Sequence, residues 1–186
     1  LIIAPALADF LDRYREIDVE LGVSDRAINL VEDNVDCVLR VGPLADSGLI
    51  ARPLGHLPLI NVAAPDYLSR YGMPCLPDDL QHHWAVKYAS PSNGRVEDWE
   101  WVDETGLHHI PMSGRVTVHS DEAYIACCLA GLGLLPIPAY AVMNHLPSTD
   151  ILEVMPAFQA APMSMTLLYS HCQPSTSRPL SVIEWF

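Results

Sequence analysis

The segment from Val116 to Pro136 contains a strand, a polar corner, an apolar helix, a glycine stop and a second buried strand in direct succession. Val116 and Val118 alternate with polar residues, which is the period-two pattern of a strand with one buried face. Ser120 or Asp121 can cap the helix that follows. This order predicts an α/β fold in which a strand ends beside a helix start, where open α/β sheets hold small ligands. The segment therefore indicates a binding domain rather than a scaffold.

The composition permits one large domain or two small ones with a buried core. The chain has 186 residues, and the 50% that are hydrophobic are spread along it in short runs. No run approaches the roughly 18–20 apolar residues of a membrane span. Residues 1–7 lack the basic start of a signal peptide and resemble the interior of a helix. We expect a cytoplasmic protein without a membrane partner, in a chain that begins after its natural start.

The charge balance argues against direct contact with nucleic acid. The formal net charge is -13, and Lys87 is the only lysine. A protein that binds DNA needs basic side chains to replace the counterions of the phosphates. We therefore expect these residues alone not to bind DNA.

The cysteines favour free buried thiols in a reducing cytoplasm. No Cys-x-x-Cys pair is present, which argues against a structural zinc site. A redox pair made from Cys127 and Cys128 is the less favoured interpretation.

The histidines do not form a metal site in this interpretation. His108 and His109 are neighbours on an expected strand, so their side chains point to opposite faces. His119 and Glu122 can approach each other at the helix start, but a third ligand is lacking. No phosphate-binding loop or nucleophile elbow occurs either. We expect no catalytic residue, no metal and no cofactor.

The patterns along the chain alternate between helix and strand, and the early succession of both predicts a parallel sheet with crossovers. Helices are expected at 1–14, 24–34, 65–71, 78–82, 121–130, 139–146 and 178–186. Strands are expected at 17–23, 36–42, 49–54, 57–64, 84–88, 116–118, 134–136, 151–155 and 165–169, with a β-hairpin over 99–110 and a loop at 91–94.

Two basic residues stand at the ends of expected strands. Arg40 and Lys87 are either exposed at the rim of the sheet or turned toward a cleft, where they can bind a carboxylate. Tyr88, Trp99 and Trp101 can line a pocket, although aromatic strand residues more often belong to the core. The sequence alone is compatible with either place for the two basic residues, the rim or the cleft. It is also compatible with either place for the three aromatic residues, the pocket or the core.

Six short segments, in order along essentially the whole chain, resemble the effector-binding domain of LysR-type transcriptional regulators. They are 10–14, 36–42, 49–55, 63–68, 79–83 and 130–136. The resemblance implies an α/β fold of two Rossmann-like subdomains with a central cleft, similar to a type 2 periplasmic binding protein. It places one subdomain at 1–61 with 167–186 and the other at 62–166, joined by strands that cross near 61–62 and 166–167.

The resemblance also implies the effector contacts. By position they are Arg40, Val41, Gly42, Pro65, Lys87, Tyr88, His119, Ser120, Asp121, Leu135 and Pro136. In this interpretation the corner at 119–121 faces Arg40 across the cleft. His119 stands where the family often has asparagine, which indicates a different effector or pH-sensitive binding. The first strand and loop of the family domain are missing from this chain.

The resulting interpretation is a regulatory domain that binds a small anionic or aromatic metabolite, although Asp121 and Glu122 oppose a negative ligand nearby. Such regulators bind DNA through a separate N-terminal winged helix-turn-helix, which this chain lacks, and they associate as dimers or tetramers. One alternative is a solute-binding protein of the same architecture that serves a transporter. An enzyme is a further alternative, but the catalytic constellation that it needs is lacking.

Overall fold

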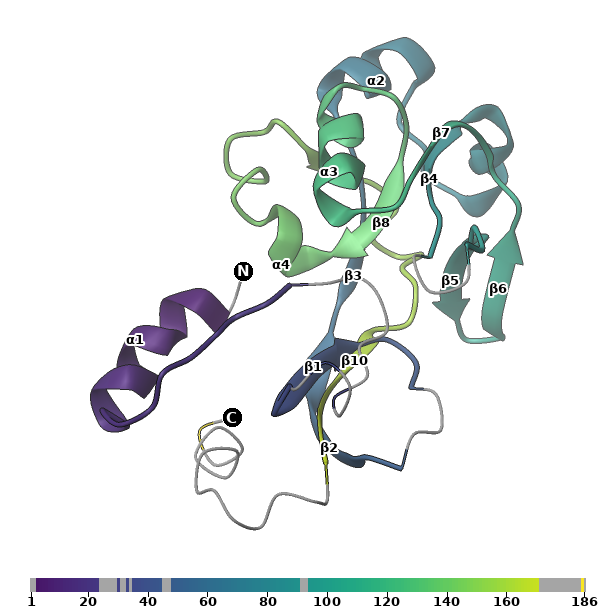
Figure 1. Cartoon of the computed structure of the whole chain (residues 1–186). Coiled ribbons are helices and arrows are strands. Elements are labelled where there is room, and N and C mark those ends of the chain that lie inside the picture. Colours follow the sequence, from purple (N-terminus) through teal and green to yellow (C-terminus); the bar gives the residue numbers. More distant parts are fainter. Residues whose placement is uncertain are drawn as a thin grey trace. The chain divides into compact units, whose positions relative to one another are not determined.

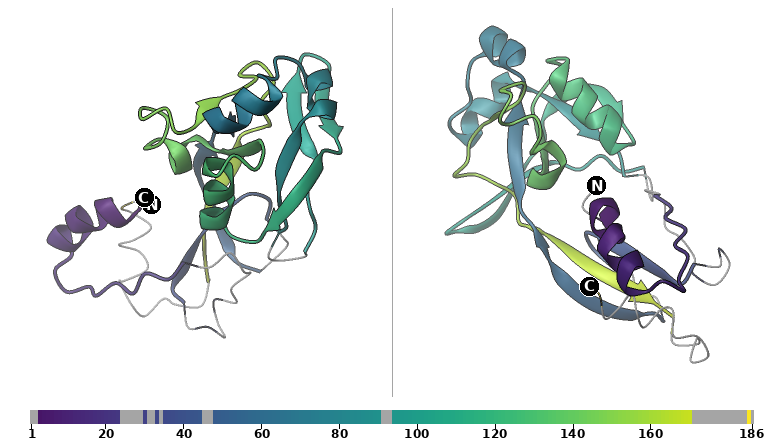
Figure 2. Two further views of the ribbon diagram at one scale, coloured as in Figure 1. Left: turned by 90° about the horizontal axis from the view of Figure 1, so that it is seen from above. Right: turned by 90° about the vertical axis from the view of Figure 1, so that its left-hand side faces the viewer.

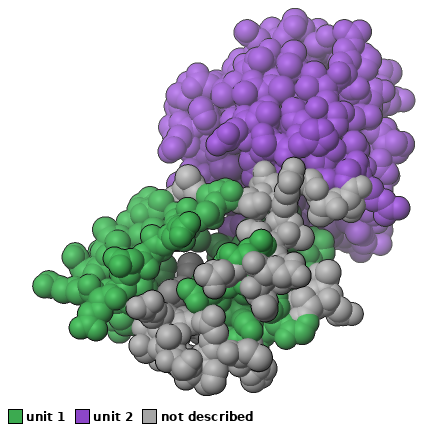
Figure 3. Space-filling view, viewed as in Figure 1, with its two compact units in different colours: residues 1–56, 163–186 green, residues 57–162 purple. Residues whose placement is uncertain are grey.

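The computed structural model describes residues 3–23, 30, 33, 35–44, 48–90, 94–170 and 185. The chain divides into two compact units, which are coloured separately in Figure 3. Unit 1 consists of Leu1–His56 and Met163–Phe186, and unit 2 consists of Leu57–Pro162. Unit 1 is therefore discontinuous in sequence, and each unit is described by itself below.

Unit 1 contains one helix and a three-stranded sheet among its described residues. The helix is α1 (Ile3–Arg13), and the strands are β1 (Cys37–Val41), β2 (Ile50–Leu57) and β10 (Met163–Tyr169), in the order β1-β10-β2. β10 lies between the other two strands and pairs antiparallel with β1, from Cys37 opposite Tyr169 to Val41 opposite Met165. The parallel sheet predicted for this part of the chain is not the pairing observed, because the strand beside β1 returns from the other end of the sequence.

The expected N-terminal helix is confirmed, and its apolar spacing explains its packing. Phe10 is 1% exposed, and its ring lies 4.9 Å from that of Tyr14 and 5.2 Å from that of Trp185. Phe10 and Tyr14 are one helical turn apart, so their side chains lie on one face. This face carries the buried contacts of α1.

The strand predicted over 17–23 is wrong. These residues form no ladder, and three of the alternating apolar side chains, Val19, Leu21 and Val23, are exposed. Alternation shows which residues would share a face of a strand, but a strand also needs a paired neighbour for its backbone. The helices expected over 24–34 and 178–186 and the loop at 91–94 lie wholly or mostly outside the described residues.

Unit 2 is built on a mixed sheet. β3 (Leu59–Ala63) lies between β8 (Leu135–Pro138) and β9 (Leu152–Glu153) and is antiparallel to both. β4 (Trp84–Tyr88) pairs parallel with β7 (Ser113–Val118). A parallel bridge between Ala85 and Leu134 connects these two parts. β4, β7 and β8 therefore run in one direction, and β3 runs in the other.

The two faces of this sheet are covered by different elements (Figures 1 and 2). On one face, α3 (Asp121–Leu129) and α4 (Ala139–Val142) contribute to a core that includes Val62, Val86 and Leu135. On the other face, α2 (Pro65–Tyr71), the 3-10 helix η1 (Pro77–His82) and the hairpin β5–β6 (Trp99–Asp103 and Gly106–Ile110) contribute to a core that includes Ala63, Ala85 and Leu134. Successive side chains of a strand point to opposite faces of the sheet, so neighbouring residues of one strand pack into different cores.

Candidate ligand-binding site

The ends of three parallel strands meet at one edge of the unit 2 sheet, which we call the carboxyl edge. Tyr88, the last residue of β4, is opposite Val118, the last residue of β7. The backbone N–H of Ala89 donates to the carbonyl of Val118 at 2.9 Å. β8 runs parallel to β4 and ends at Pro138. The corner predicted at residues 119–121 therefore lies at the carboxyl edge, next to Tyr88.

The polar corner begins α3 as its sequence predicts. Ser120 is the N-cap, and its Oγ accepts from the backbone N–H of Ala123 at 3.4 Å. Asp121 and Glu122 occupy the first turn. The backbone N–H groups of a first helical turn have no partner within the helix, so they can donate to a bound acceptor. His119 and Asp121 are exposed beside them.

Two tyrosines that the sequence interpretation missed lie at the same edge. Tyr124 of α3 is 7% exposed, and its ring lies 5.3 Å from that of Tyr88 at an interplanar angle of 60°. Tyr140 belongs to α4, which directly follows β8. Burial raises the pKa of both phenols, and the nearby carboxylate of Asp121 raises both further. Both are therefore neutral hydrogen-bond donors at ordinary pH.

The remaining predicted residues of unit 2 occupy different places. Leu135 is fully buried and Pro136 half-buried within β8, where they are opposite Val62 and Asn61 of β3. Pro65 starts α2 after the end of β3, and β3 is antiparallel to β8, so Pro65 lies at the opposite edge of the sheet. The structure does not bring Pro65 to the carboxyl edge.

The side chain of Lys87 does not lie on the same face of the sheet as that of Tyr88. Successive residues of a strand point to opposite faces, and Tyr88 packs with the core under α3. A Cβ atom placed on Gly114 would lie 2.8 Å from Cγ of Lys87, so the lysine stem crosses β7 at Gly114. Its stem therefore follows the hairpin face of the sheet.

The three predicted residues of unit 1 form the end of β1. Arg40 is opposite Thr166 and Val41 is opposite Met165 in β10. Gly42 has φ +94°, and its backbone N–H donates to the carbonyl of Ser164 at 2.9 Å. Oγ of Ser164 donates back to the Gly42 carbonyl at 3.0 Å. The glycine turn at the end of this strand is thus fixed by β10.

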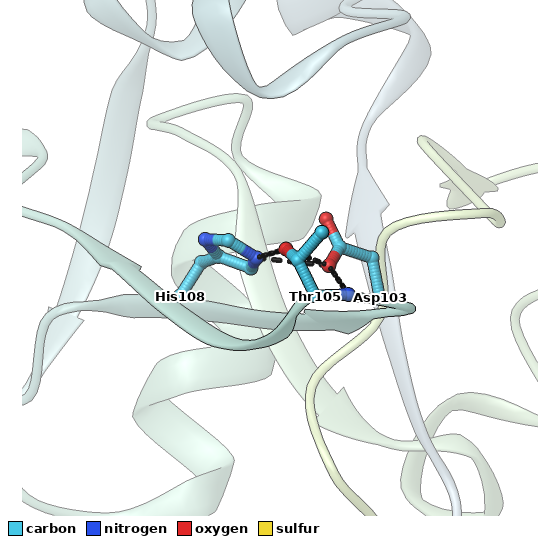
Figure 4. A network of polar contacts seen from close by, with 3 residues as sticks. All are labelled: Asp103, Thr105 and His108. Atoms are coloured by element: carbon cyan, nitrogen blue, oxygen red, sulfur yellow. Dashed lines mark hydrogen bonds and ion pairs between the residues drawn. The ribbon is translucent and has the colours of Figure 1, made fainter.

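A polar network on the exposed hairpin has the residue types of a catalytic triad but not its geometry (Figure 4). Oδ1 of Asp103 accepts from the backbone N–H of Thr105 at 2.8 Å and from its Oγ1 at 2.6 Å. Nε2 of His108 lies 2.9 Å from the same carboxylate oxygen and 2.8 Å from Oγ1 of Thr105. In a triad the imidazole uses one nitrogen for the acid and the other for the nucleophile. Here one nitrogen faces both groups, so the network stabilises the hairpin turn.

These hydrogen bonds hold the pKa of Asp103 well below its usual range, with the Thr105 hydroxyl as the largest cause. His108 also stacks on Trp101, with ring centroids 5.0 Å apart, while His109 lies 3.2 Å from Glu100 on the other side of the hairpin. The two histidines therefore have separate carboxylate partners.

The structure gives no support for a metal site among the residues that it describes, and of the cysteines expected to be buried, Cys75 is exposed and Cys127 is half-buried. No group of three or more potential ligands occurs among these residues. Cys128 is fully buried, and burial raises the pKa of its thiol to about 12. Such a thiol stays protonated and is a poor nucleophile.

None of the helices in the described part of the chain has the length and apolar character that a membrane span needs.

Comparison with known families gives one match over residues 1–186, to the family described as LysR substrate binding domain. Among curated relatives, the chain is 36% identical over 184 residues to the HTH-type transcriptional regulator YhjC of Escherichia coli, a match that covers 99% of this chain and 62% of YhjC. It is 30% identical over 171 residues to the HTH-type transcriptional activator AaeR of Escherichia coli, covering 91% of this chain and 54% of AaeR. The chain thus spans little more than half the length of these relatives.

Solved structures of LysR-type regulators have a fold similar to that of this chain. The regulatory domain of CrgA, a LysR-type transcriptional regulator from Neisseria meningitidis, superposes with a TM-score of 0.84 at 28% identity, covering 98% of this chain and 89% of that one. The full-length Vibrio cholerae virulence activator AphB gives a TM-score of 0.80 at 26% identity, covering 97% of this chain and 61% of AphB. The chain therefore has the α/β fold of LysR regulatory domains, which is similar to that of periplasmic binding proteins.

Proposed function

We propose, since the chain belongs to the family of LysR substrate-binding domains, that it binds a small-molecule effector and thereby controls a separate DNA-binding segment. The relatives YhjC and AaeR are both named as transcriptional regulators. This favours a regulatory domain over a solute-binding protein that serves a transporter. In this proposal DNA is bound by an N-terminal winged helix-turn-helix, and the protein acts in the cytoplasm as a dimer or tetramer.

The observation that carries the proposal is the convergence of Tyr88 and the Ser120 corner at the carboxyl edge. Open α/β sheets bind ligands where strands end and helices begin. The first turn of α3 offers backbone donors there, and Ser120 offers a hydroxyl. No bond is made or broken in this proposal, since effector binding only favours one arrangement of the regulator over another.

The proposed contacts from unit 2 are Tyr88, His119, Ser120 and Asp121, with Pro136 and Leu135 supporting them from β8. Arg40, Val41 and Gly42 are proposed as the contacts from unit 1. We keep 1–61 with 167–186 and 62–166 as the proposed subdomains.

The test is a thermal-shift screen of small carboxylates and aromatic compounds with the 186-residue chain. A compound that binds only the folded state raises its melting temperature. The dissociation constant of a hit is then measured by calorimetry for the wild type and for Ser120→Ala. Loss of one hydrogen bond of about 1 kcal/mol is expected to weaken binding about fivefold.

Ser69→Ala is the matched control, because Ser69 is an exposed serine of α2, the helix that starts at the opposite edge of the sheet. It should leave the dissociation constant unchanged. Calorimetry is needed because Ser120→Ala also removes a helix cap, which costs about 1 kcal/mol of stability. Equal affinities for the wild type and Ser120→Ala would show that the effector binds elsewhere.

A further inference from the structure

The chain passes between its two units at two places, and the second passage is fixed to β3 by one residue. Residues 154–162, which we call the return segment, lead from β9 in unit 2 to β10 in unit 1. The backbone carbonyl of Asn61 accepts from the N–H of Val154 at 2.8 Å. Nδ2 of Asn61 donates to the carbonyl of Phe158 at 2.8 Å. Asn61 therefore holds the return segment at two points.

The side chain of Asn61 keeps one polar atom unpaired. The residue is 1% exposed, and its Oδ1 is buried without a hydrogen-bond partner among the residues that the structure describes. Ile60 and Val62 belong to the core under α3, so Asn61 points to the other face of the sheet, where Val154 and Met155 are buried. A buried carbonyl oxygen without a donor costs free energy. Holding the return segment in place therefore has a cost at Asn61.

The backbone of the return segment carries a second cost, at Met155. Its φ is +47°, in the left-handed region that residues other than glycine rarely occupy. Its side chain is nevertheless only 3% exposed and packs in the same core as Trp99. The N–H of Phe158 donates to the Met155 carbonyl at 2.9 Å and closes the turn. A left-handed methionine persists only where its surroundings fix it, and such strain is typical of segments that change conformation.

The next contact of the return segment is with the hairpin. The N–H of Val102 donates to the carbonyl of Gln159 at 3.0 Å. Val102 is exposed, so water can replace this bond when the segment leaves β3.

We propose that residues 154–158 form a latch, which opens while the rest of unit 2 stays folded and so frees one of the two chain connections between the units. Opening gives the Asn61 oxygen access to water and lets Met155 leave the left-handed region. The open latch therefore lies closer in free energy to the native state than the unfolded unit does. A regulator needs a two-state element of this kind if binding is to favour one of its arrangements. The inference goes beyond the proposed function and does not depend on where the effector binds.

Native-state hydrogen exchange of the 186-residue chain, followed by NMR, tests the latch. Rates are measured for the amides of Val154, Phe158 and Val86 at urea concentrations below the unfolding transition. The Val86 amide donates to the Leu134 carbonyl at 2.9 Å within the sheet, so it reports the opening of unit 2 as a whole. After correction for intrinsic rates, the two latch amides should exchange about tenfold faster than that of Val86 or more. Their rates should hardly change with urea, because a local opening exposes little surface.

Met155→Gly and Met155→Ala separate the backbone strain from the side chain, since both variants lose the buried methionine side chain. Glycine adopts a φ of +47° without strain, whereas alanine does not. The latch amides should therefore exchange about fivefold more slowly in Met155→Gly than in Met155→Ala. Val154, whose φ is not positive, is the control position. There the glycine variant should exchange faster at Phe158 than the alanine variant.

Asn61→Ala removes the bond to the Phe158 carbonyl and should speed exchange at both latch amides about fivefold, as expected for one hydrogen bond. Asn144→Ala, at an exposed asparagine after α4, should leave their rates unchanged. If Asn61→Ala does not fold, the wild-type urea series and the two Met155 variants still decide.

Three outcomes would overturn the inference. They are latch amides that share the rate and urea dependence of Val86, slower exchange in Met155→Ala than in Met155→Gly, and unchanged latch rates in a folded Asn61→Ala. None of these measurements uses an effector. The latch can therefore fail while the proposed function stands, and the proposed function can fail while the latch stands.

Discussion

At the scale of single residues, a buried polar contact of unit 2 joins Tyr67 and His83. Oη of Tyr67 lies 3.1 Å from Nδ1 of His83 and accepts from the backbone N–H of Trp84 at 2.8 Å. Tyr67 is 0% exposed and His83 is 5% exposed. The contact fixes α2 to the start of β4. Burial lowers the pKa of His83 below its ordinary 6.5, although the carboxylate of Asp79 acts in the other direction.

Stability is expected to depend on pH through His83. The unfolded chain binds a proton at His83 near pH 6.5, whereas the folded chain does so only at lower pH. The free energy of unfolding is therefore highest above pH 6.5 and falls as the pH drops toward the lowered pKa. Urea unfolding at pH 7 and pH 5 measures this fall, and His83→Gln should reduce it.

The control for this prediction is His82→Gln, at the exposed neighbouring histidine. This variant should keep the pH dependence of the wild type. If His82→Gln removes the dependence and His83→Gln keeps it, the assignment to the buried imidazole is wrong.

The site residues that the sequence could predict are those with local signals. Ser120 was found as a helix cap because capping depends on residues within one turn. Tyr124 was missed because a tyrosine in an apolar helix has the pattern of any core residue. Its place at the carboxyl edge results from the contact between its ring and that of Tyr88 in β4, and no local pattern shows that.

At the scale of elements, two glycines allow the backbone of β4 to lie very close to its neighbours. A Cβ atom on Gly114 of β7 would lie 2.5 Å from the carbonyl oxygen of Ala85. One on Gly133, just before β8, would lie 2.7 Å from the carbonyl oxygen of Trp84. Contacts this short with backbone atoms cannot be relieved by a side-chain rotation. The spacing on both sides of β4 therefore requires glycine.

Gly133→Ala should destabilise unit 2. The added methyl group would force β4 and the start of β8 apart, and such overpacking typically costs about 1–3 kcal/mol. Urea unfolding should show a lower midpoint than in the wild type. Gly22→Ala is the control, because a Cβ atom there would have nothing within 4 Å. Equal midpoints for the two variants would contradict the close packing of β4.

The elements that the sequence predicted correctly are those with a local cause. The hairpin at 99–110 follows from its turn, where Asp103 caps the backbone of Thr105. The strand expected at 17–23 failed because its existence depends on a neighbour that the pattern does not specify. The antiparallel pairing of β1 with β10 likewise joins residues far apart in the sequence.

At the scale of the whole molecule, the chain leaves unit 1 and returns to it. β10 follows the whole of unit 2 in the sequence and lies between β1 and β2 in the sheet of unit 1. The ordered resemblance to LysR-type regulators predicts a discontinuous subdomain, which composition and periodicity alone do not specify.

The overall charge leads to the last prediction, that these 186 residues alone do not bind DNA. The chain has 10 lysine and arginine residues against 23 aspartate and glutamate residues. Binding through phosphates releases counterions, so it strengthens steeply as salt is lowered. Fluorescence anisotropy of a labelled duplex should therefore stay at its free value at both low and moderate salt. Any affinity that falls as salt rises would mean that the ten basic residues form a concentrated patch, despite the net charge of -13. That result would place part of the DNA contact within this domain, instead of in the separate segment that we propose.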